Sequence, residues 1–282
     1  MDNPQRPTMR SRKLGQRLRA LREERGLTLQ GAARLLHRTP SSLSKLETGK
    51  RGIRRPALEH MLDRYEVTDS RDRECLFDLA EHVAEKGWWH RYEGRLLSST
   101  VDYIGLESEA NSIKSFQLHL IPGLLQTEAY ARAIMQVGGS QGESVEVDAM
   151  TAVRLRRQEV LSKPRPPQFN AIVSEAALRQ RIGGEATMEA QLGHLIEASR
   201  LGHVTVRVLP FSAGAHAGIN GSFSVISTRD LSVVLVENLT AGWYLEADKD
   251  VRRYDWSYVQ LLKSSLSVED SLELIEKLRS KI

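Results

Sequence analysis

The chain has 282 residues, a length that corresponds to about two domains at roughly 150 residues each. Hydrophobic residues make up 40% of it and charged residues 27%, which is typical of a globular protein with a buried core. No run of about 18 apolar residues occurs, which excludes a membrane-spanning helix, and the first residues do not resemble a secretory signal. Cys75 is the only cysteine, which excludes an internal disulfide. We therefore expect a cytoplasmic protein.

The charge is distributed unevenly along the chain. Residues 1–70 contain 16 Lys and Arg against 8 Asp and Glu, a net charge of +8. Residues 71–282 contain 24 against 28, a net charge of −4. A strongly basic segment on an otherwise acidic chain favours a polyanionic partner such as nucleic acid. The charge alone is equally compatible with a basic surface that is merely solvated. The pattern of apolar residues is needed to decide between these two interpretations.

The first 66 residues have the pattern of four short helices. In the first helix, Leu14, Leu18 and Leu21 repeat at the spacing of one helix face. The fourth helix is predicted over residues 56–65. Two short helices with a tight connection, inside a basic helical bundle, describe a helix-turn-helix. The residues that set the helix boundaries are Thr28 and Thr39 as N-caps, Pro40 at a first helical position, and Gly26 and Gly49 as terminators.

Residues 12–66 resemble the helix-turn-helix domain of the lambda-repressor-like, or Xre-type, regulators. The most specific element is the segment Ser-Lys-Leu-Glu-Thr-Gly-Lys at residues 44–50, preceded by Arg-Glu-Glu-Arg-Gly at residues 22–26. The resemblance implies sequence-specific binding to double-stranded DNA. It also implies that the third helix is the recognition helix and lies in the major groove.

The resemblance places the base-reading residues on the outward side of the third helix. The serine hydroxyls can donate to or accept from several base edges, and Lys45 can reach the O6 and N7 acceptors of guanine. The expected base-reading residues are Pro40, Ser41, Ser42, Ser44 and Lys45.

A second group of residues is expected to contact the DNA backbone. Four cations follow the recognition helix within six residues, which favours phosphate contact over a solvated surface. The hydroxyl-bearing residues begin helices, where backbone N–H groups can hold a phosphate. The expected phosphate contacts are Thr28, Thr39, Lys50, Arg51, Arg54 and Arg55.

The resemblance also implies one structural ion pair, between Arg22 on the first helix and Glu47 on the recognition helix. This pair orients the helix and does not contact DNA. Two residues depart from the family pattern. His37 stands where glycine usually ends the second helix, and Gly31 stands where glutamate often completes a capping box.

The rest of the chain mixes helical and strand-like patterns. A helix over residues 70–86 is predicted to link the domains, which gives a helix-turn-helix domain at 11–66, a linking helix at 67–87 and a second domain at 88–282. The apolar runs at 203–209, 222–227 and 232–237 are separated by turns and predict a small antiparallel sheet. We expect an all-α N-terminal domain and an α+β C-terminal domain. Further expected helices are 107–115, 127–137, 145–162, 174–182, 186–200, 248–263 and 268–280, and further strands are 117–121 and 168–173.

The C-terminal segment carries no recognisable catalytic motif. It has no phosphate-binding glycine loop, no nucleophile elbow and no zinc-protease motif. The eight histidines never lie three or four residues apart, so we expect no metal site. We predict no enzyme activity and no cofactor.

Residues 88–276 resemble the uncharacterised C-terminal domain of the actinobacterial WhiJ-like regulators. The resemblance is carried mainly by Pro-Gly-Leu-Leu-Gln-Thr at 122–127 and by Ser-Glu-Ala-Ala-Leu at 174–178. It implies a regulator of development or secondary metabolism, often encoded beside a small partner protein.

Three functional hypotheses follow. The leading one is a nucleoid-associated transcription regulator, a homodimer held by residues 88–282, whose C-terminal domain binds a small protein or a small-molecule effector. The second is an antitoxin-like interaction module whose DNA binding is autoregulatory. The third, an enzyme tethered to DNA, is disfavoured because catalytic motifs are missing from the sequence.

Overall fold

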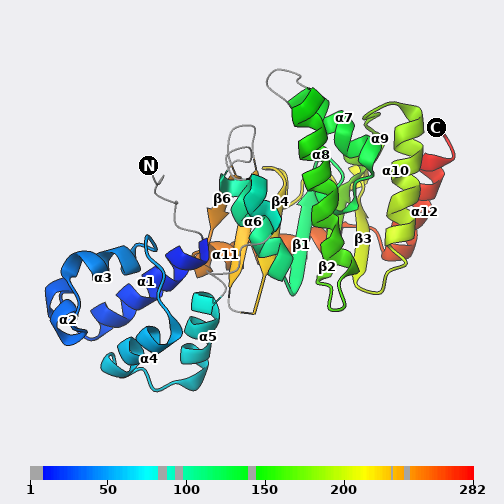
Figure 1. The fold of residues 1–282 in the computed structure, drawn as a ribbon. Helices are drawn as coiled ribbons and strands as arrows, with labels where there is room; N and C mark the ends of the chain where they lie inside the picture. Colours follow the sequence, from blue (N-terminus) through cyan, green and yellow to red (C-terminus); the bar gives the residue numbers. More distant parts are fainter. Residues whose placement is uncertain (1–8, 82–87, 93–97, 139–143, 230, 238–241) are drawn as a thin grey trace. The chain divides into compact units, whose positions relative to one another are not determined.

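The computed structural model describes residues 9–81, 88–92, 98–138, 144–229, 231–237 and 242–282, and these form two compact units (Figure 1). The first unit comprises residues 1–92 and the second comprises residues 93–282. The described part of the first unit is entirely helical, and the second combines helices with one sheet. The expected fold class, all-α followed by α+β, is therefore confirmed.

The first unit contains the four helices expected from the sequence and a fifth. All four helices of the helix-turn-helix pattern lie within one or two residues of their predicted bounds. Predicted residues 82–86 of the fifth helix lie outside the described residues. The helices are α1 (Met9–Glu24), α2 (Leu29–Leu35), α3 (Pro40–Glu47), α4 (Arg55–Arg64) and α5 (Ser70–Glu81), followed by a 3-10 turn, η1 (Trp88–Tyr92).

The ends of α2 and α3 follow from their capping residues. Thr28 Oγ1 accepts a hydrogen bond from the Gly31 backbone N–H at 3.0 Å, and Thr39 Oγ1 accepts one from Ser42 N–H at 3.1 Å. His37, which replaces the usual glycine after α2, has a φ of 52°. This left-handed conformation costs a residue with a side chain more than it costs glycine.

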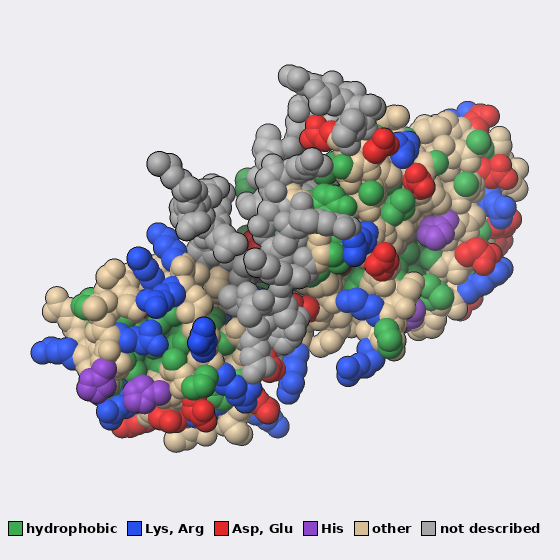
Figure 2. All heavy atoms as spheres, viewed as in Figure 1, with side chains coloured by type: hydrophobic (Ala, Val, Ile, Leu, Met, Phe, Trp, Pro, Cys, Tyr) green, Lys and Arg blue, Asp and Glu red, His purple; other side chains and the backbone are tan. Residues whose placement is uncertain are grey.

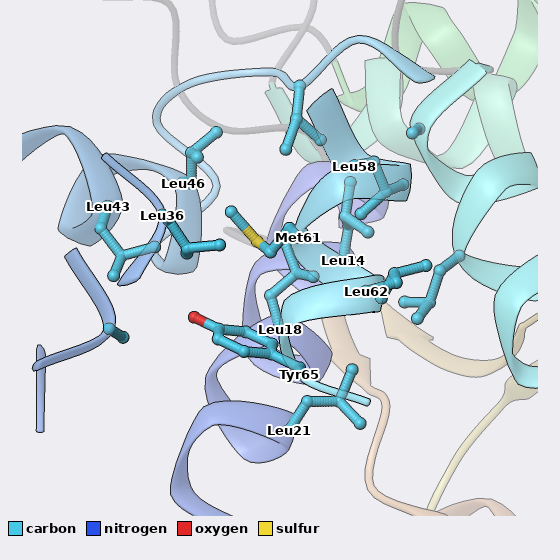
Figure 3. Packing of buried hydrophobic residues seen from close by; sticks show 14 of the residues in the cluster. Leu14, Leu18, Leu21, Leu36, Leu43, Leu46, Leu58, Met61, Leu62 and Tyr65 are labelled. Atoms are coloured by element: carbon cyan, nitrogen blue, oxygen red, sulfur yellow. The ribbon is translucent and has the colours of Figure 1, made fainter. Parts of the chain in front are cut away.

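Leucine side chains from α1, α3 and α4 meet in the core of the first unit, with Met61 and Tyr65 of the α4 end between them (Figure 3). Leu18, Leu43, Leu58 and Leu62 are at most 1% exposed. The helix predicted to link two domains, α5, adds side chains to the same core, and these are Leu76, Phe77, Leu79 and Ala80.

The second unit is built on a six-stranded mixed sheet in the order β3-β2-β1-β4-β5-β6. The three strands β1, β2 and β3 pair in parallel, whereas β1–β4, β4–β5 and β5–β6 pair antiparallel. The strands are β1 (Ser112–Gln117), β2 (Gln168–Ser174), β3 (Val204–Leu209), β4 (Phe223–Ser227), β5 (Ser232–Glu237) and β6 (Gly242–Leu245).

Helices cover both faces of this sheet. In Figure 1, α11 lies behind the sheet, and α6 and α8 lie in front of it. The helices are α6 (Ser98–Glu109), α7 (Glu128–Gly138), α8 (Ser144–Gln158), α9 (Glu175–Arg179), α10 (Glu185–Ala198), α11 (Asp248–Ser264) and α12 (Val268–Arg279), with 3-10 turns η2 (Gly123–Leu125), η3 (Glu159–Ser162) and η4 (Phe211–Ala213).

The sheet is larger than the small antiparallel sheet expected, and one strand lies elsewhere. Residues 204–209 were expected beside 222–227, but β3 is separated from β4 by the two central strands β2 and β1. Antiparallel pairing does occur in β4, β5 and β6. The sequence order of the strands does not reveal this arrangement, because helical crossovers join β1 to β2 and β2 to β3 and make those pairs parallel.

Two expected elements around residue 110 are wrong. Residues 112–117 form β1, whereas the sequence pattern favoured a helix at 107–115 and a strand at 117–121. Polar side chains in β1 conceal the fact that it is a central strand of the sheet, and two of them have tertiary partners. Lys114 Nζ lies 2.6 Å from Asp255 of α11, and Ser115 Oγ accepts a hydrogen bond from Ser224 Oγ. The short edge strand β6 was also not predicted.

Buried amide side chains fix the turn at residues 122–127. Gln126 donates to the Ile121 carbonyl at 2.7 Å. Gln191 of α10 accepts from the Thr127 N–H and donates to the Leu125 carbonyl, each at 2.7 Å. These bonds satisfy the backbone of a segment buried between helices. Gln158 of α8 also donates to the Gln126 carbonyl at 2.7 Å, so the segment at 122–127 has a structural role in joining α7, α8 and α10.

The close contact of α1 with α3 generates a stability prediction. A Cβ atom at Gly15 would lie 2.6 Å from the carbonyl oxygens of Leu46 and Glu47. We expect Gly15→Ala to destabilise the first unit by about 1–3 kcal/mol, because backbone must move to relieve the overlap. Hydrogen exchange of the α1–α4 amides measures this change without assuming that both units unfold together.

Gly31→Ala is the matched control, because a Cβ atom there would meet only side-chain atoms, the exposed Thr28 hydroxyl at 3.3 Å and a Leu27 methyl group at 4.0 Å. This variant should be neutral or more stable by up to about 1 kcal/mol, since alanine favours the helix. Equal effects of the two substitutions would contradict the close contact between α1 and α3.

Candidate nucleic-acid interface

The first half of α3 presents its polar side chains to solvent. Pro40, Ser41 and Lys45 are exposed, and Ser42 and Ser44 are partly exposed. On the opposite side of the same helix, Leu43 and Leu46 are 0% and 3% exposed. The structure therefore brings all five residues expected to read bases to the outward surface of one helix.

Arg51 connects the two groups of expected contacts. Its Nη1 donates to Ser42 Oγ at 3.2 Å, and its backbone N–H donates to the Lys45 carbonyl at 3.1 Å. A residue assigned to phosphate thus also holds a serine assigned to base reading. This contact was not predicted from the sequence, because it depends on how the chain turns back after Gly49, whose φ is 71°.

The other expected phosphate contacts fall into three groups. The hydroxyl oxygens of Thr28 and Thr39 accept the capping bonds, which leaves each O–H as a donor. Lys50 and Arg54 are exposed. The Arg55 guanidinium carbon lies 4.5 Å from the centre of the Phe77 ring, so this residue also packs α4 against α5.

Ion pairs determine which cations of the first unit remain available. Arg17 pairs with Asp72 at 2.9 Å, Arg19 with Glu23 at 2.8 Å and Arg73 with Asp63 at 2.8 Å, and Arg25 pairs with Glu66. In contrast, the described residues offer no ion-pair partner to Lys45, Lys50 or Arg54. Figure 2 shows Lys and Arg side chains spread over the surface of this helical unit. Acids thus pair with several arginines of α1, α5 and the loop after α1, whereas no described acid pairs with Lys45, Lys50 or Arg54.

Two further cations near α3, Arg34 and Arg38, were not among the phosphate contacts expected from the sequence. They lie at and just beyond the end of α2. Arg34 is exposed and Arg38 partly exposed, and neither forms an ion pair within the described part of the chain. Their place just before α3 was the signal that could have identified them.

Arg22 and Glu47 form a buried, two-pronged ion pair between α1 and α3. Arg22 Nε lies 2.7 Å from Glu47 Oε1, and Nη2 lies 3.0 Å from Oε2. The two side chains are only 9% and 5% exposed. Arg22 Nη1 also donates to the Leu27 carbonyl at 2.7 Å. Hydrogen bonding to Glu47 raises the pKa of Arg22, which stays charged and holds α3 against α1.

Tyr65 lies in the core near this ion pair. Burial raises the pKa of its phenol to about 12, and the charge of Glu47 adds to the effect. Its hydroxyl is buried and finds no hydrogen-bond partner among the described residues. The phenol is therefore neutral, and its ring rather than its hydroxyl stabilises the core.

The ion pair predicts strong energetic coupling. Glu47→Leu and Arg22→Met should each destabilise the first unit by about 3–5 kcal/mol, because each leaves one buried charge without its partner. The double variant should lose much less than the sum. Hydrogen exchange of the α1–α4 amides measures all three, and strictly additive losses would contradict the coupling.

Tyr65→Phe tests the role of the neighbouring phenol. The variant should keep wild-type stability or gain about 1 kcal/mol, since it removes a buried hydroxyl that lacks a partner. The same exchange measurement applies. A loss of more than about 1 kcal/mol would show that the hydroxyl makes a stabilising bond.

Two sequence families match the chain. Residues 13–74 match a helix-turn-helix domain. Residues 100–277, more than half of the chain, match a domain of unknown function, DUF5753. No curated protein and no solved structure matches the chain significantly, and none of the described helices is long and apolar enough to cross a membrane. A helix-turn-helix domain indicates DNA binding and a regulator of transcription rather than an enzyme. The chain thus belongs to the DUF5753 family and carries its domain behind an N-terminal helix-turn-helix.

Proposed function

We propose that the protein is a sequence-specific transcription regulator of the Xre type, acting in the cytoplasm on double-stranded DNA. The observation that carries the proposal is the outward, polar side of α3, held in place by the buried pair of Arg22 and Glu47. The exposed side chains of Lys45, Lys50 and Arg54 support it, because backbone phosphates attract cations wherever the recognition helix enters the groove.

Each residue of the interface has a role in this proposal. Lys45 contacts guanine, and the hydroxyls of Ser41, Ser42 and Ser44 contact base edges, with Pro40 packed against the groove wall. Arg51 holds Ser42 and reaches a phosphate with its remaining N–H donors. Thr28, Thr39, Lys50, Arg54 and Arg55 bind the backbone and fix the register of α3.

We further propose that the second unit makes the regulator responsive. One helix-turn-helix module covers little DNA, so tight binding usually needs two modules on half-sites about one helical turn apart. A homodimer held by residues 88–282 supplies the second module. A partner protein, or a small-molecule effector, bound to the same unit then changes operator affinity. The resemblance to the actinobacterial WhiJ-like regulators supports this arrangement.

Two substitutions separate base reading from phosphate binding. Lys45→Ala should weaken binding to the preferred site by about 1–3 kcal/mol and relax the preference at one base pair. Arg54→Ala should weaken preferred and random duplexes about equally and reduce the salt dependence. Gel-shift titrations on a site selected from a random duplex library measure both. Unaltered binding by both variants at physiological salt would contradict the assignment of α3.

The regulatory proposal is tested with a partner that co-purifies from native cells. Adding it to the protein–operator complex should weaken operator binding about 5–150-fold, the range typical of coupling between two sites. Fluorescence anisotropy of labelled operator gives the change. Binding of the partner with no change in operator affinity would leave residues 88–282 as a dimerisation scaffold and would contradict regulation.

A further inference from the structure

Helix α11 covers one face of the sheet with a strongly apolar side. Tyr258 and Leu261 are 3% and 0% exposed and pack against the strands. The Tyr258 hydroxyl also donates to the Asn170 carbonyl of β2 at 2.9 Å. These contacts fix the rotation of the helix, so its outer side is a rigid surface.

The outer side of α11 combines cations with exposed apolar side chains. Trp256 is 61% exposed and Val259 is 45% exposed. At about 3.6 residues per turn, four cations lie on the same side of the helix as Trp256, opposite the buried side. Asp255 lies off this side and pairs with Lys114. We call this surface the basic tryptophan face, and its residues are Lys249, Arg252, Arg253, Trp256, Val259 and Lys263.

The cations of the basic tryptophan face have no partner in the described chain. The structure gives none of the four an ion pair with any described residue, and all four are exposed along the helix. Yet residues 71–282 carry a net charge of −4. Four cations around a central tryptophan are therefore a local exception on an acidic unit, and a surface required only for solubility has no need of the tryptophan.

We propose that the basic tryptophan face binds an acidic polypeptide segment of a partner protein, with an apolar side chain that covers Trp256. This inference rests on the proposed binding of a partner by the second unit and assigns the surface. Arginine forks match carboxylates, and tryptophan and arginine dominate the binding energy of protein interfaces. Two arguments exclude other occupants. Duplex DNA would use the cations without Trp256, and a second copy of the face would oppose cations to cations.

The test uses the full chain and a fluorescein-labelled helical peptide of about 18 residues, with glutamates on one side and leucines on the other. A peptide of the same composition in scrambled order, a single-stranded oligothymidine and a random duplex serve as comparison probes. Anisotropy titrations at physiological salt compare the wild-type protein with Trp256→Ala and with the Arg252→Ala/Arg253→Ala double variant. Leu201→Ala and Lys277→Ala, at exposed positions on or near other helices, are the matched controls.

We expect the patterned peptide to bind at least about tenfold more weakly to each α11 variant than to the wild-type protein. The scrambled peptide should bind at least about tenfold more weakly than the patterned one, and both control variants should stay within about twofold. Operator affinity measured without peptide should be the same for all variants. If the peptide binds as expected but does not change operator affinity, the proposed regulation is contradicted, whereas the assignment of this surface as a peptide-binding site stands.

Three results would overturn the proposal. The first is patterned-peptide binding that does not respond to either α11 variant, or no binding at all. The second is oligonucleotide binding that falls with the arginine variant and not with Trp256→Ala, which would make the face a nucleic-acid surface. The third is a fall in the mass of the protein in light scattering with the α11 variants, which would make the occupant a second copy.

Discussion

The geometry of the DNA-binding unit depends on one buried ion pair. Arg22 and Glu47 meet through two short hydrogen bonds, and Arg22 holds the Leu27 carbonyl with a third. A buried charge is costly without its partner, so the pair tolerates few alternative positions of α3 relative to α1. Gly15 permits this arrangement, because α1 approaches the carbonyl end of α3 so closely that a side chain would collide. The outward side of α3 is rigid because its inward side is so constrained.

The charged residues around α3 differ from those of the other helices in their ion pairing. Acids of α1, α4 and α5 pair with neighbouring arginines, whereas Lys45, Lys50 and Arg54 form no ion pair with a described residue. Exposed cations therefore lie beside α3, although the net charge of the whole chain is only +4. The second unit repeats this contrast on a smaller scale, since α11 presents unpaired cations on an otherwise acidic unit. In both places, the apolar side of a helix packs in the core, and cations lie on the outer side of α11 and, at α3, on Lys45 and on the residues that follow the helix.

Much of the first unit could be predicted from the sequence because its signals are local. Caps such as Thr28 and Thr39, terminators such as Gly26 and the spacing of Leu14, Leu18 and Leu21 all act within a few residues. For the second unit, only the fold class, α+β, could be predicted. In its strand β1, Lys114 and Ser115 have side-chain partners more than a hundred residues away in the sequence. The residues next to them in the sequence do not indicate such partners. The bond from Arg51 to Ser42 was missed for a different reason, since it depends on how the chain turns after Gly49.

We propose α3 as the helix that reads base edges, and Ser41 offers the most direct test of that role. Ser41 is exposed in the first turn of α3, and asparagine there can form two hydrogen bonds with adenine in the major groove. Binding sites selected from a random duplex library should differ between the wild-type protein and Ser41→Asn at a single base pair per half-site, with adenine gained at that position. Identical selected sites for the two proteins, with affinity retained, would contradict base reading by this face of α3.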